Sequence, residues 1–207
     1  PLTALAVVQL ARQAGMPDGV LNCVVGMDAA GIGKVLTGDS RVKKVTFTGS
    51  TQVGKILYRQ CADSVKKISL ELGGNAPFIV FDDADLDAAI EGAMLCKFRN
   101  AGQTCVCANR ILVQDGIHDR FVEAFVERVQ SMTVADGTME GSEIGPLINP
   151  AGKAKVEMHV NDALLKGAKV ICGGAGHSAG PLFYCPTVLI GVTKDMMMAS
   201  EETFGPV

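Results

Sequence analysis

Segments with the periodicity of a strand alternate with segments with the periodicity of a helix, and this alternation constrains the fold of the chain more than any other feature. In the first third, short runs rich in β-branched residues are separated by stretches whose apolar residues recur every three or four positions. The expected order is helix 3–14 (capped by Thr3), strand 20–25, helix 28–36, strand 42–47, helix 51–62 and strand 67–72. This order predicts an α/β fold with a parallel sheet covered by helices, whose ligands bind beyond the carboxyl ends of the strands.

A second series of elements begins after Gly73-Gly74, where we place a boundary between domains 1–73 and 74–207. Strand 77–81 comes first, and a helix then starts at Asp85 and ends near Phe98. The apolar residues of this helix fall on one face, and they are Leu86, Ala89, Ile90, Ala93 and Met94. The remaining expected elements are strand 110–114, helices 119–132 and 150–166, strand 169–172 and a glycine-rich loop over 173–180.

The composition excludes several classes of protein. Of the 207 residues, 48% are hydrophobic and 20% are charged, which indicates a buried core and not a disordered chain. A formal charge of −3 leaves no basic surface for nucleic acid or anionic lipid. No apolar run approaches the ~18 residues that a membrane-spanning helix needs. The chain opens at Pro1 without a targeting signal and closes on Val207 after a Gly-Pro turn, so we expect a segment of a longer protein.

The seven cysteines are an odd number, and most of them lie in apolar stretches. We interpret these as small buried residues of a protein from a reducing compartment. Cys105 and Cys107 differ, because they lie in a polar loop, but two cysteines without a second pair or a nearby histidine do not make a zinc site. The three histidines, His118, His159 and His177, are scattered and are expected at the surface or at helix caps.

Two segments place polar residues where a strand ends. Gly49 and Ser50 lie between a strand and a helix, where free backbone amides suit a pyrophosphate; the alternative is an ordinary serine-capped helix. Glu71 lies in an otherwise apolar strand before two glycines. There its carboxylate is expected to be partly desolvated, with a raised pKa that suits a general base; the alternative is a carboxylate that caps the next segment.

A third segment presents a cysteine on a loop that contains one glycine. Cys105 follows the end of a helix, where loop amides can stabilise a thiolate. No histidine is adjacent, so a cysteine–histidine dyad is not supported. Arg99 opens the loop and could bind a carboxylate through its guanidinium; the alternative is a surface ion pair.

Four motifs together resemble the aldehyde dehydrogenase superfamily. They are Phe47-Thr48-Gly49-Ser50-Thr51, Leu70-Glu71-Leu72-Gly73-Gly74, Gly102-Gln103-Thr104-Cys105 and Glu202-Thr203-Phe204-Gly205-Pro206. They occur in the family's order, with 34 residues from Glu71 to Cys105 and 97 from Cys105 to Glu202. The segment from Lys97 to Arg110 is most similar to the succinate-semialdehyde dehydrogenase branch. The resemblance covers the whole chain and less than half of a full-length member.

The resemblance implies four residues that take part in the chemistry. Cys105 would be the nucleophile, and Glu71 would be the general base for the water that releases the product. Arg99 would bind the distal carboxylate of the substrate, and Cys107 would be a reversible redox partner of the nucleophile; the alternative for Cys107 is a small residue packed under the loop. The oxyanion-hole asparagine of the family would lie ahead of Pro1.

The resemblance also implies a site for NADP or NAD, and it favours NADP. Gly49 and Ser50 would lie at the pyrophosphate and Leu72 beside the nicotinamide. Glu202 would hold the nicotinamide ribose, with Phe204 packed beside it. Residues 1–73 would then be part of a Rossmann-like cofactor domain, and residues 74–207 would be part of the catalytic domain that carries the nucleophile.

The function that follows from the resemblance is the oxidation of succinate semialdehyde to succinate through a thiohemiacetal and a thioester. Another short aldehyde with a terminal carboxylate, such as glutarate semialdehyde, and a catalytically inactive scaffold are the alternatives. The parent protein would be a homodimer or homotetramer in the cytoplasm, or in the mitochondrial matrix of a eukaryote. The isolated segment is expected to be inactive.

Overall fold

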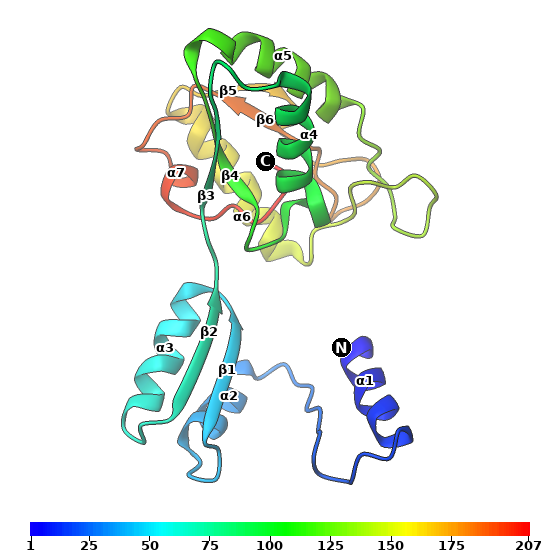
Figure 1. Cartoon of the computed structure of the whole chain (residues 1–207), viewed down its shortest axis with the longest axis vertical. Coiled ribbons are helices and arrows are strands. Elements are labelled where there is room, and N and C mark those ends of the chain that lie inside the picture. Colours follow the sequence, from blue (N-terminus) through cyan, green and yellow to red (C-terminus); the bar gives the residue numbers. More distant parts are fainter. The chain divides into compact units, whose positions relative to one another are not determined.

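The structure, a computed structural model, describes residues 1–207 and divides into two compact units, Pro1–Leu72 and Gly73–Val207 (Figure 1). Both units combine helices with parallel strands, as the sequence predicts. None of the helices has both the length and the apolar character that crossing a bilayer demands.

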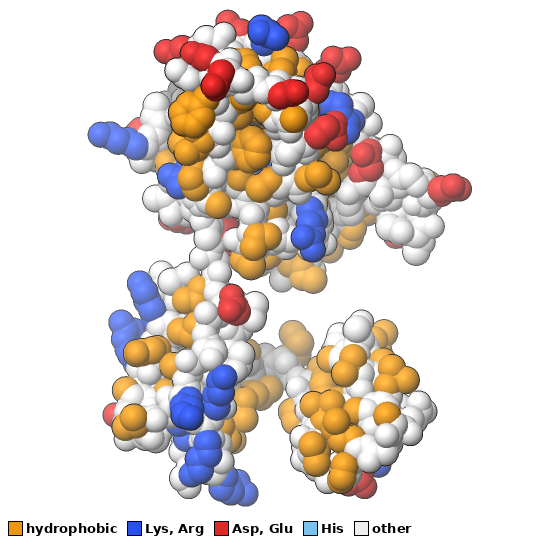
Figure 2. Space-filling view, in the orientation of Figure 1, with side chains coloured by type: hydrophobic (Ala, Val, Ile, Leu, Met, Phe, Trp, Pro, Cys, Tyr) orange, Lys and Arg blue, Asp and Glu red, His pale blue; other side chains and the backbone are white.

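The first unit is built around two parallel strands, β1 (Lys44–Gly49) and β2 (Lys67–Leu72). The crossover between them is α3 (Thr51–Ala62), which packs against both strands and against α2 (Ala29–Gly38). The expected helix 51–62 and strand 67–72 are confirmed at both ends. The first helix, α1 (Leu2–Gln13), has no buried residue, and its apolar side chains remain exposed (Figure 2).

The expected strand over residues 20–25 is wrong. The segment begins with bends and pairs with no strand, because β1 and β2 pair only with each other. Val20, Val24 and Val25 are all more than half exposed. A β-branched run has strand propensity, but a strand forms only where a partner accepts its backbone hydrogen bonds. The cap at Thr3 is also wrong, because the helix already begins at Leu2.

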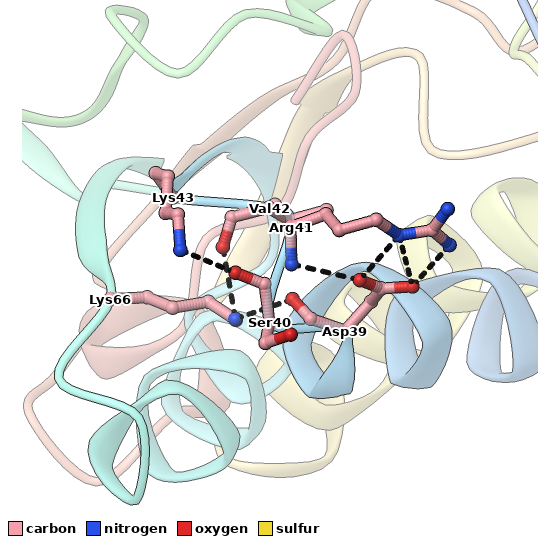
Figure 3. A network of polar contacts seen from close by, with 6 residues as sticks. All are labelled: Asp39, Ser40, Arg41, Val42, Lys43 and Lys66. Atoms are coloured by element: carbon pink, nitrogen blue, oxygen red, sulfur yellow. Dashed lines mark hydrogen bonds and ion pairs between the residues drawn. The ribbon is translucent and has the colours of Figure 1, made fainter.

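A polar network fixes the connections into the two strands (Figure 3). Lys66, just before β2, donates hydrogen bonds to the carbonyl oxygens of Asp39 and Val42, at 2.7 and 3.0 Å. The Arg41 guanidinium bonds the carboxylate of Asp39 and holds the pKa of that carboxyl well below its usual range. Lys43 closes the turn by donating to the carbonyl oxygen of Ser40, at 2.6 Å. These contacts join the segment before β1 to the residue that precedes β2.

The second unit contains a parallel pair, an antiparallel pair and the helices around them. The parallel strands are β3 (Ala76–Val80) and β4 (Ala108–Val113); the antiparallel ones are β5 (Lys169–Cys172) and β6 (Val188–Ile190). The helices are α4 (Leu86–Phe98), the 3-10 turn η1 (Arg99–Gly102), α5 (Asp115–Gln130), α6 (Pro150–Leu165) and α7 (Met197–Ser200). The sequence analysis missed β6 and α7, which are both short, and it began α5 four residues too late.

The core of this unit lies between α4, α5 and the parallel strands. The predicted apolar face of α4 is confirmed, because Ile90, Ala93 and Met94 are all buried. Phe125 of α5 packs against Phe98 and Phe121, with ring centroids 6.0 and 5.5 Å apart. This packing gives the segment that follows Phe98 a fixed starting point.

Candidate active site

The turn between β1 and α3 has the strand–turn–helix geometry that the sequence predicts. β1 ends at Gly49, and Ser50 caps α3 by accepting a hydrogen bond from the amide of Val53 at 3.3 Å. The amides of the first helical turn have no partners within the helix, and the helix dipole makes this end electropositive. The turn is therefore compatible with an anionic group, although the serine itself acts as an ordinary cap.

Glu71 and Leu72 end the neighbouring strand at the same edge. In the parallel register Glu71 faces Thr48 and Leu72 faces Gly49, so the carboxyl ends of β1 and β2 carry the two motifs side by side. Leu72 is half-buried, and its side chain packs against Gly54 of α3. Glu71 is exposed, so the expected desolvation of its carboxylate is wrong.

The loop that carries Cys105 begins with a left-handed turn. After α4 ends at Phe98, three consecutive residues have positive φ: 53° at Asn100, 54° at Ala101 and 70° at Gly102. Two of these three residues are not glycine, and Ala101 is buried. Such strained residues persist only where the surroundings hold them, and they concentrate at functional sites. The sequence predicts a polar loop here but not this conformation.

Contacts from distant segments hold the loop in place. A Cβ atom on Gly102 would overlap the backbone carbonyl of Gly205, so these two backbones touch in a way that only glycine at position 102 permits. Gln103 donates to the carbonyl oxygen of Pro146 at 3.3 Å and accepts from the amide of Ile148 at 2.9 Å. Asn100 donates to the carbonyl oxygen of Gln103 at 3.1 Å. The loop is therefore a fixed support for the residues that follow it.

Cys105 is the one exposed cysteine of the seven. Its backbone carbonyl lies 3.1 Å from the position that a Cβ atom on Gly74 would take. The amide of Gly74 donates to the carboxylate of Glu202 at 3.3 Å, and a Cβ atom on Gly73 would overlap that same carboxylate. The second unit thus brings the Cys105 loop and Glu202 to one short stretch of glycine backbone.

Cys107 is buried under the loop. Its sulfur lies 2.6 Å from the hydroxyl oxygen of Thr104 and donates to the carbonyl oxygen of Lys97 at 3.4 Å. This arrangement agrees with the interpretation of Cys107 as a small packed residue. A redox partnership with Cys105 stays a prediction, and it would require the buried thiol to leave these contacts.

Lys97 lies beneath the same loop, and the sequence analysis did not single it out as a site residue. Its side chain is buried, and its ammonium donates to the side-chain oxygen of Asn109 at 2.8 Å. Burial lowers the pKa of Lys97 to about 8, against the opposite influence of Cys107, Cys96 and Glu202. No local pattern in the sequence reveals this burial. Lys97 comes three residues after the last residue of the apolar helix face, so the sequence predicts an exposed lysine at the end of the helix.

Arg99 and Phe204 are both exposed. Arg99 forms no ion pair, so the alternative of a surface ion pair is wrong. Phe204 has a φ of 55°, which is unusual for a bulky residue, and it follows Glu202 by two positions. Both residues can therefore meet a ligand.

Asn75 is a further residue that sequence reasoning missed, although it directly follows the two glycines. Its side-chain nitrogen donates to the carbonyl oxygens of Met198 and Ala199, and its backbone carbonyl oxygen accepts two hydrogen bonds from Arg110. Its side-chain oxygen is buried without a partner. Asn75 therefore ties the glycine stretch to the segment that leads to Glu202.

A hollow in the second unit lies apart from Cys105. It has a volume of about 770 Å³ and is lined mainly by apolar side chains of β4, β6 and α5, without Cys105 or Glu202. No group of three or more His, Cys, Asp or Glu side chains is placed to hold a metal ion.

The chain matches the model of the aldehyde dehydrogenase family over residues 1–207. It is 60% identical over 207 residues to a mitochondrial succinate-semialdehyde dehydrogenase of Arabidopsis thaliana, and 59% identical over 206 residues to a 3-sulfolactaldehyde dehydrogenase of Pseudomonas putida. These alignments cover 100% of the chain and 39% and 42% of the two relatives. A solved structure described as an E. coli NADP dependent enzyme has a TM-score of 0.97 at 55% identity, over 100% of this chain and 43% of that one.

The chain thus spans about two fifths of the length of these relatives. The match extends over both units, including the strained Cys105 loop of the second and the Gly49-Ser50 turn of the first. From the sequence match and the structural likeness together, this chain belongs to the aldehyde dehydrogenase family.

Proposed function

We propose that the protein to which this chain belongs oxidises succinate semialdehyde to succinate, with NADP or NAD as the oxidant and Cys105 as the nucleophile. The observation that carries the proposal is the placement of Cys105: one exposed thiol on a strained, fixed loop beside Gly74. A fixed nucleophile lowers the entropic cost of reaching the reacting carbon. The family match along the whole chain supports the same chemistry.

The covalent steps follow from the chemistry of the thiolate. The sulfur of Cys105 adds to the aldehyde carbon and forms a thiohemiacetal, in which the former carbonyl oxygen carries the charge. Loss of a hydride from that carbon leaves a thioester on Cys105. Glu71 takes a proton from water, the water attacks the thioester, and the acid leaves as the thiolate is restored. One aldehyde and one water give one carboxylate, with two electrons removed as hydride.

Five residues are assigned to the cofactor, each within its own unit. Gly49 and Ser50 stand at an electropositive helix start that suits a pyrophosphate, and Leu72 ends the adjacent strand as an apolar neighbour for a nicotinamide. In the second unit the Glu202 carboxylate can accept hydrogen bonds from ribose hydroxyls, and Phe204 is exposed beside it. When bound, NADP or NAD supplies the hydride acceptor.

A terminal anion on the aldehyde is the property that the proposal requires of the substrate. The names of the two curated relatives specify succinate semialdehyde and 3-sulfolactaldehyde, which share a short chain that ends in a negative charge. Arg99 has a guanidinium without an ion-pair partner and can bind such a group at two points. This supports an ω-anionic aldehyde, and 3-sulfolactaldehyde is therefore the second candidate substrate, with glutarate semialdehyde as a longer alternative.

The proposal includes the setting of the intact protein. It would act on a small aldehyde without nucleic acid or membrane partners, as a homodimer or homotetramer in the cytoplasm or in the mitochondrial matrix. Sedimentation of the intact protein at micromolar concentration tests the oligomeric state, and a monomer would contradict that part.

The test of the proposed function is a steady-state assay on an intact protein that carries this chain, with NADP and NAD in turn. Succinate semialdehyde is expected to give the highest kcat/KM among succinate semialdehyde, 3-sulfolactaldehyde, glutarate semialdehyde and butanal, which lacks the anion. Cys105→Ala is expected to retain cofactor binding and less than about 1% of turnover, because no other group replaces covalent catalysis. Cys107→Ala is the matched control for the loss of a nearby thiol. Equal rates with butanal, or residual turnover above that level in Cys105→Ala, would contradict the proposal.

A further inference from the structure

One face of α6, together with its C-cap residue Lys166, forms a polar stripe that consists of Lys155, His159, Asp162 and Lys166. These residues are spaced by four, three and four positions, so they lie on one side of the helix. All four form hydrogen bonds with the segment 195–203, which includes Glu202. Lys155 donates to the carbonyl oxygen of Glu202 at 2.5 Å, the amide of Met197 donates to Asp162 at 2.7 Å, and Lys166 donates to the carbonyl oxygen of Asp195 at 2.7 Å.

His159 is the innermost member of the stripe. Its side chain has no solvent exposure, which corrects the expectation of a surface or capping histidine. Its Nδ1 lies 3.2 Å from the hydroxyl oxygen of Thr203, which is itself only 2% exposed. A buried polar pair of this kind costs free energy if either member is removed, because the remaining group loses its partner without regaining water.

The pair is next to the residue that the proposed function assigns to the cofactor ribose. Thr203 follows Glu202 directly, and Phe204 then has a φ of 55°. Glu202 has its backbone carbonyl bonded by Lys155 and its side chain against Gly73 and Gly74. The His159–Thr203 contact joins α6 to the residue between Glu202 and Phe204.

We propose that His159 is a positioning residue for Glu202: through Thr203 it holds the Glu202 carboxylate where a nicotinamide ribose would meet it. This inference rests on the proposed function, and it concerns the affinity for cofactor rather than the chemical steps at Cys105. His159 itself touches neither the reacting atoms nor the cofactor. Removal of the contact is therefore expected to weaken cofactor binding while the covalent chemistry at saturating cofactor continues.

The surroundings of His159 favour its neutral form. Burial lowers the pKa of His159, as does the nearby charge of Lys155, while Glu201 and Asp162 act in the opposite direction. Its Nε2 lies 3.5 Å from the carboxylate of Glu201 without a hydrogen bond. A neutral imidazole keeps one ring nitrogen free to accept and the other to donate, so it can satisfy the Thr203 hydroxyl in either direction.

The experiment uses three variants and one control in an intact protein that carries this chain. Thr203→Val removes the hydroxyl at almost constant shape, and His159→Leu removes the ring nitrogens. His159→Asn places an amide near the position of Nδ1. Glu157→Gln, on the same helix, removes a charge whose ion-pair partner is Lys153 at 3.9 Å, away from the segment 195–203. The dissociation constants of NADP and NAD are measured by calorimetry, and kcat is measured at saturating cofactor.

Thr203→Val and His159→Leu are each expected to weaken cofactor binding about threefold to tenfold, as the loss of one buried hydrogen bond predicts. Their double variant should be no weaker than the worse single one, because both remove the same contact. kcat should stay within about twofold of the parent, His159→Asn should recover most of the affinity, and Glu157→Gln should not change it.

Unchanged cofactor affinity in a folded Thr203→Val protein would overturn the inference, and so would a fall in kcat without a change in affinity. Should His159→Leu fail to fold, Thr203→Val and His159→Asn still decide the question. The proposed function fails in a different way: the parent protein would then bind cofactor but oxidise none of the aldehydes in the series. That result would leave the calorimetric comparison of the variants intact.

Discussion

The Gly49-Ser50 turn and the Cys105 loop both follow a regular element and both contain glycine. The turn is stabilised by a local hydrogen bond, whereas the loop is stabilised by contacts with distant segments. The turn has ordinary backbone angles, with φ of −67° at Ser50, and its stabilising hydrogen bond spans three residues. The loop has three consecutive left-handed residues, and its contacts reach to Pro146, Ile148 and Gly205.

The difference shows where local sequence is enough to determine a shape. A serine that follows a strand can determine the turn locally, because its side chain caps the next helix. A left-handed alanine cannot be predicted from its neighbours in sequence, since its conformation is imposed by segments that lie far away along the chain. The predictions below test this contrast between a locally determined turn and a remotely determined loop.

The largest effect is expected from Gly102→Ala. The new Cβ atom would combine a left-handed backbone with an overlap at the Gly205 carbonyl, and we expect a loss of about 4 kcal/mol in the free energy of unfolding of the second unit. Hydrogen exchange checks this, because amides of β4 should lose protection while those of β1 and β2 keep theirs. The matched control is Gly38→Ala, where no atom lies within 4 Å of the new Cβ and stability should change little. Equal protection of β4 in both variants would show that the loop is not pinned at Gly102.

The next effect concerns the buried cation beneath the loop. The folded-state pKa of Lys97 is lowered from 10.5 to about 8, so the folded protein releases this proton at a lower pH than the unfolded chain does. Stability should therefore rise with pH between about 8 and 10.5, by on the order of 3 kcal/mol, and fall again as the pH returns to 8. Urea unfolding of the parent and of Lys97→Met over this range measures it, since Lys97→Met should lack the additional rise. Parallel pH profiles would contradict the burial of a charged Lys97.

Glu71→Gln tests a residue at the carboxyl end of the locally determined β2. The thiolate can still add and one hydride can still leave, but the water lacks its base, so turnover should fall by about 100-fold. A stopped-flow trace should show one rapid burst of reduced cofactor followed by slow turnover. Glu91→Gln, on the exposed side of α4, is the control for the loss of a carboxylate. Disappearance of the burst would instead assign Glu71 an earlier role, such as activation of the thiol.

The smallest effect is expected from Ser50→Ala. Loss of the cap should lower the stability of the first unit by about 1 kcal/mol, and Ser50→Gly should cost only a few tenths of that. Chemical denaturation followed by exchange at α3 measures the difference. An effect as large as that of Gly102→Ala would mean that the turn, too, depends on distant contacts.

The parts of the fold that sequence could predict are those fixed by near neighbours. α3 and β2 were predicted to the residue, and the buried face of α4 followed from its periodicity. The segment 20–25 has the same β-branched character as a strand and is not one, because strand formation depends on a partner that local composition does not specify. Short elements such as β6 carry too few residues for a period to appear.

The residues of the candidate site likewise fall into those that the sequence predicts and those that depend on distant contacts. Motif positions such as Cys105 and Glu202 are visible in the sequence because they are recognised by order and spacing. Lys97 and His159 were missed, since each is defined by burial under residues that are distant in the chain. The exposure of Glu71 was also missed, because an apolar strand predicts a covered face only when a neighbouring element supplies the cover.

The contact between Gly102 and Gly205 also limits how early during synthesis the Cys105 loop can fold. The two glycines are 103 residues apart, so the loop that carries Cys105 cannot reach its final shape until the chain has grown past Gly205. At a synthesis rate of roughly 5 to 20 residues per second, that delay is about 5 to 20 seconds. All contacts between β1, α3 and β2 are made by residues up to Leu72, so they do not depend on the synthesis of Gly205. A nascent chain therefore passes through a stage in which the β1–β2 pairing can already form while Cys105 is present but not yet held in place.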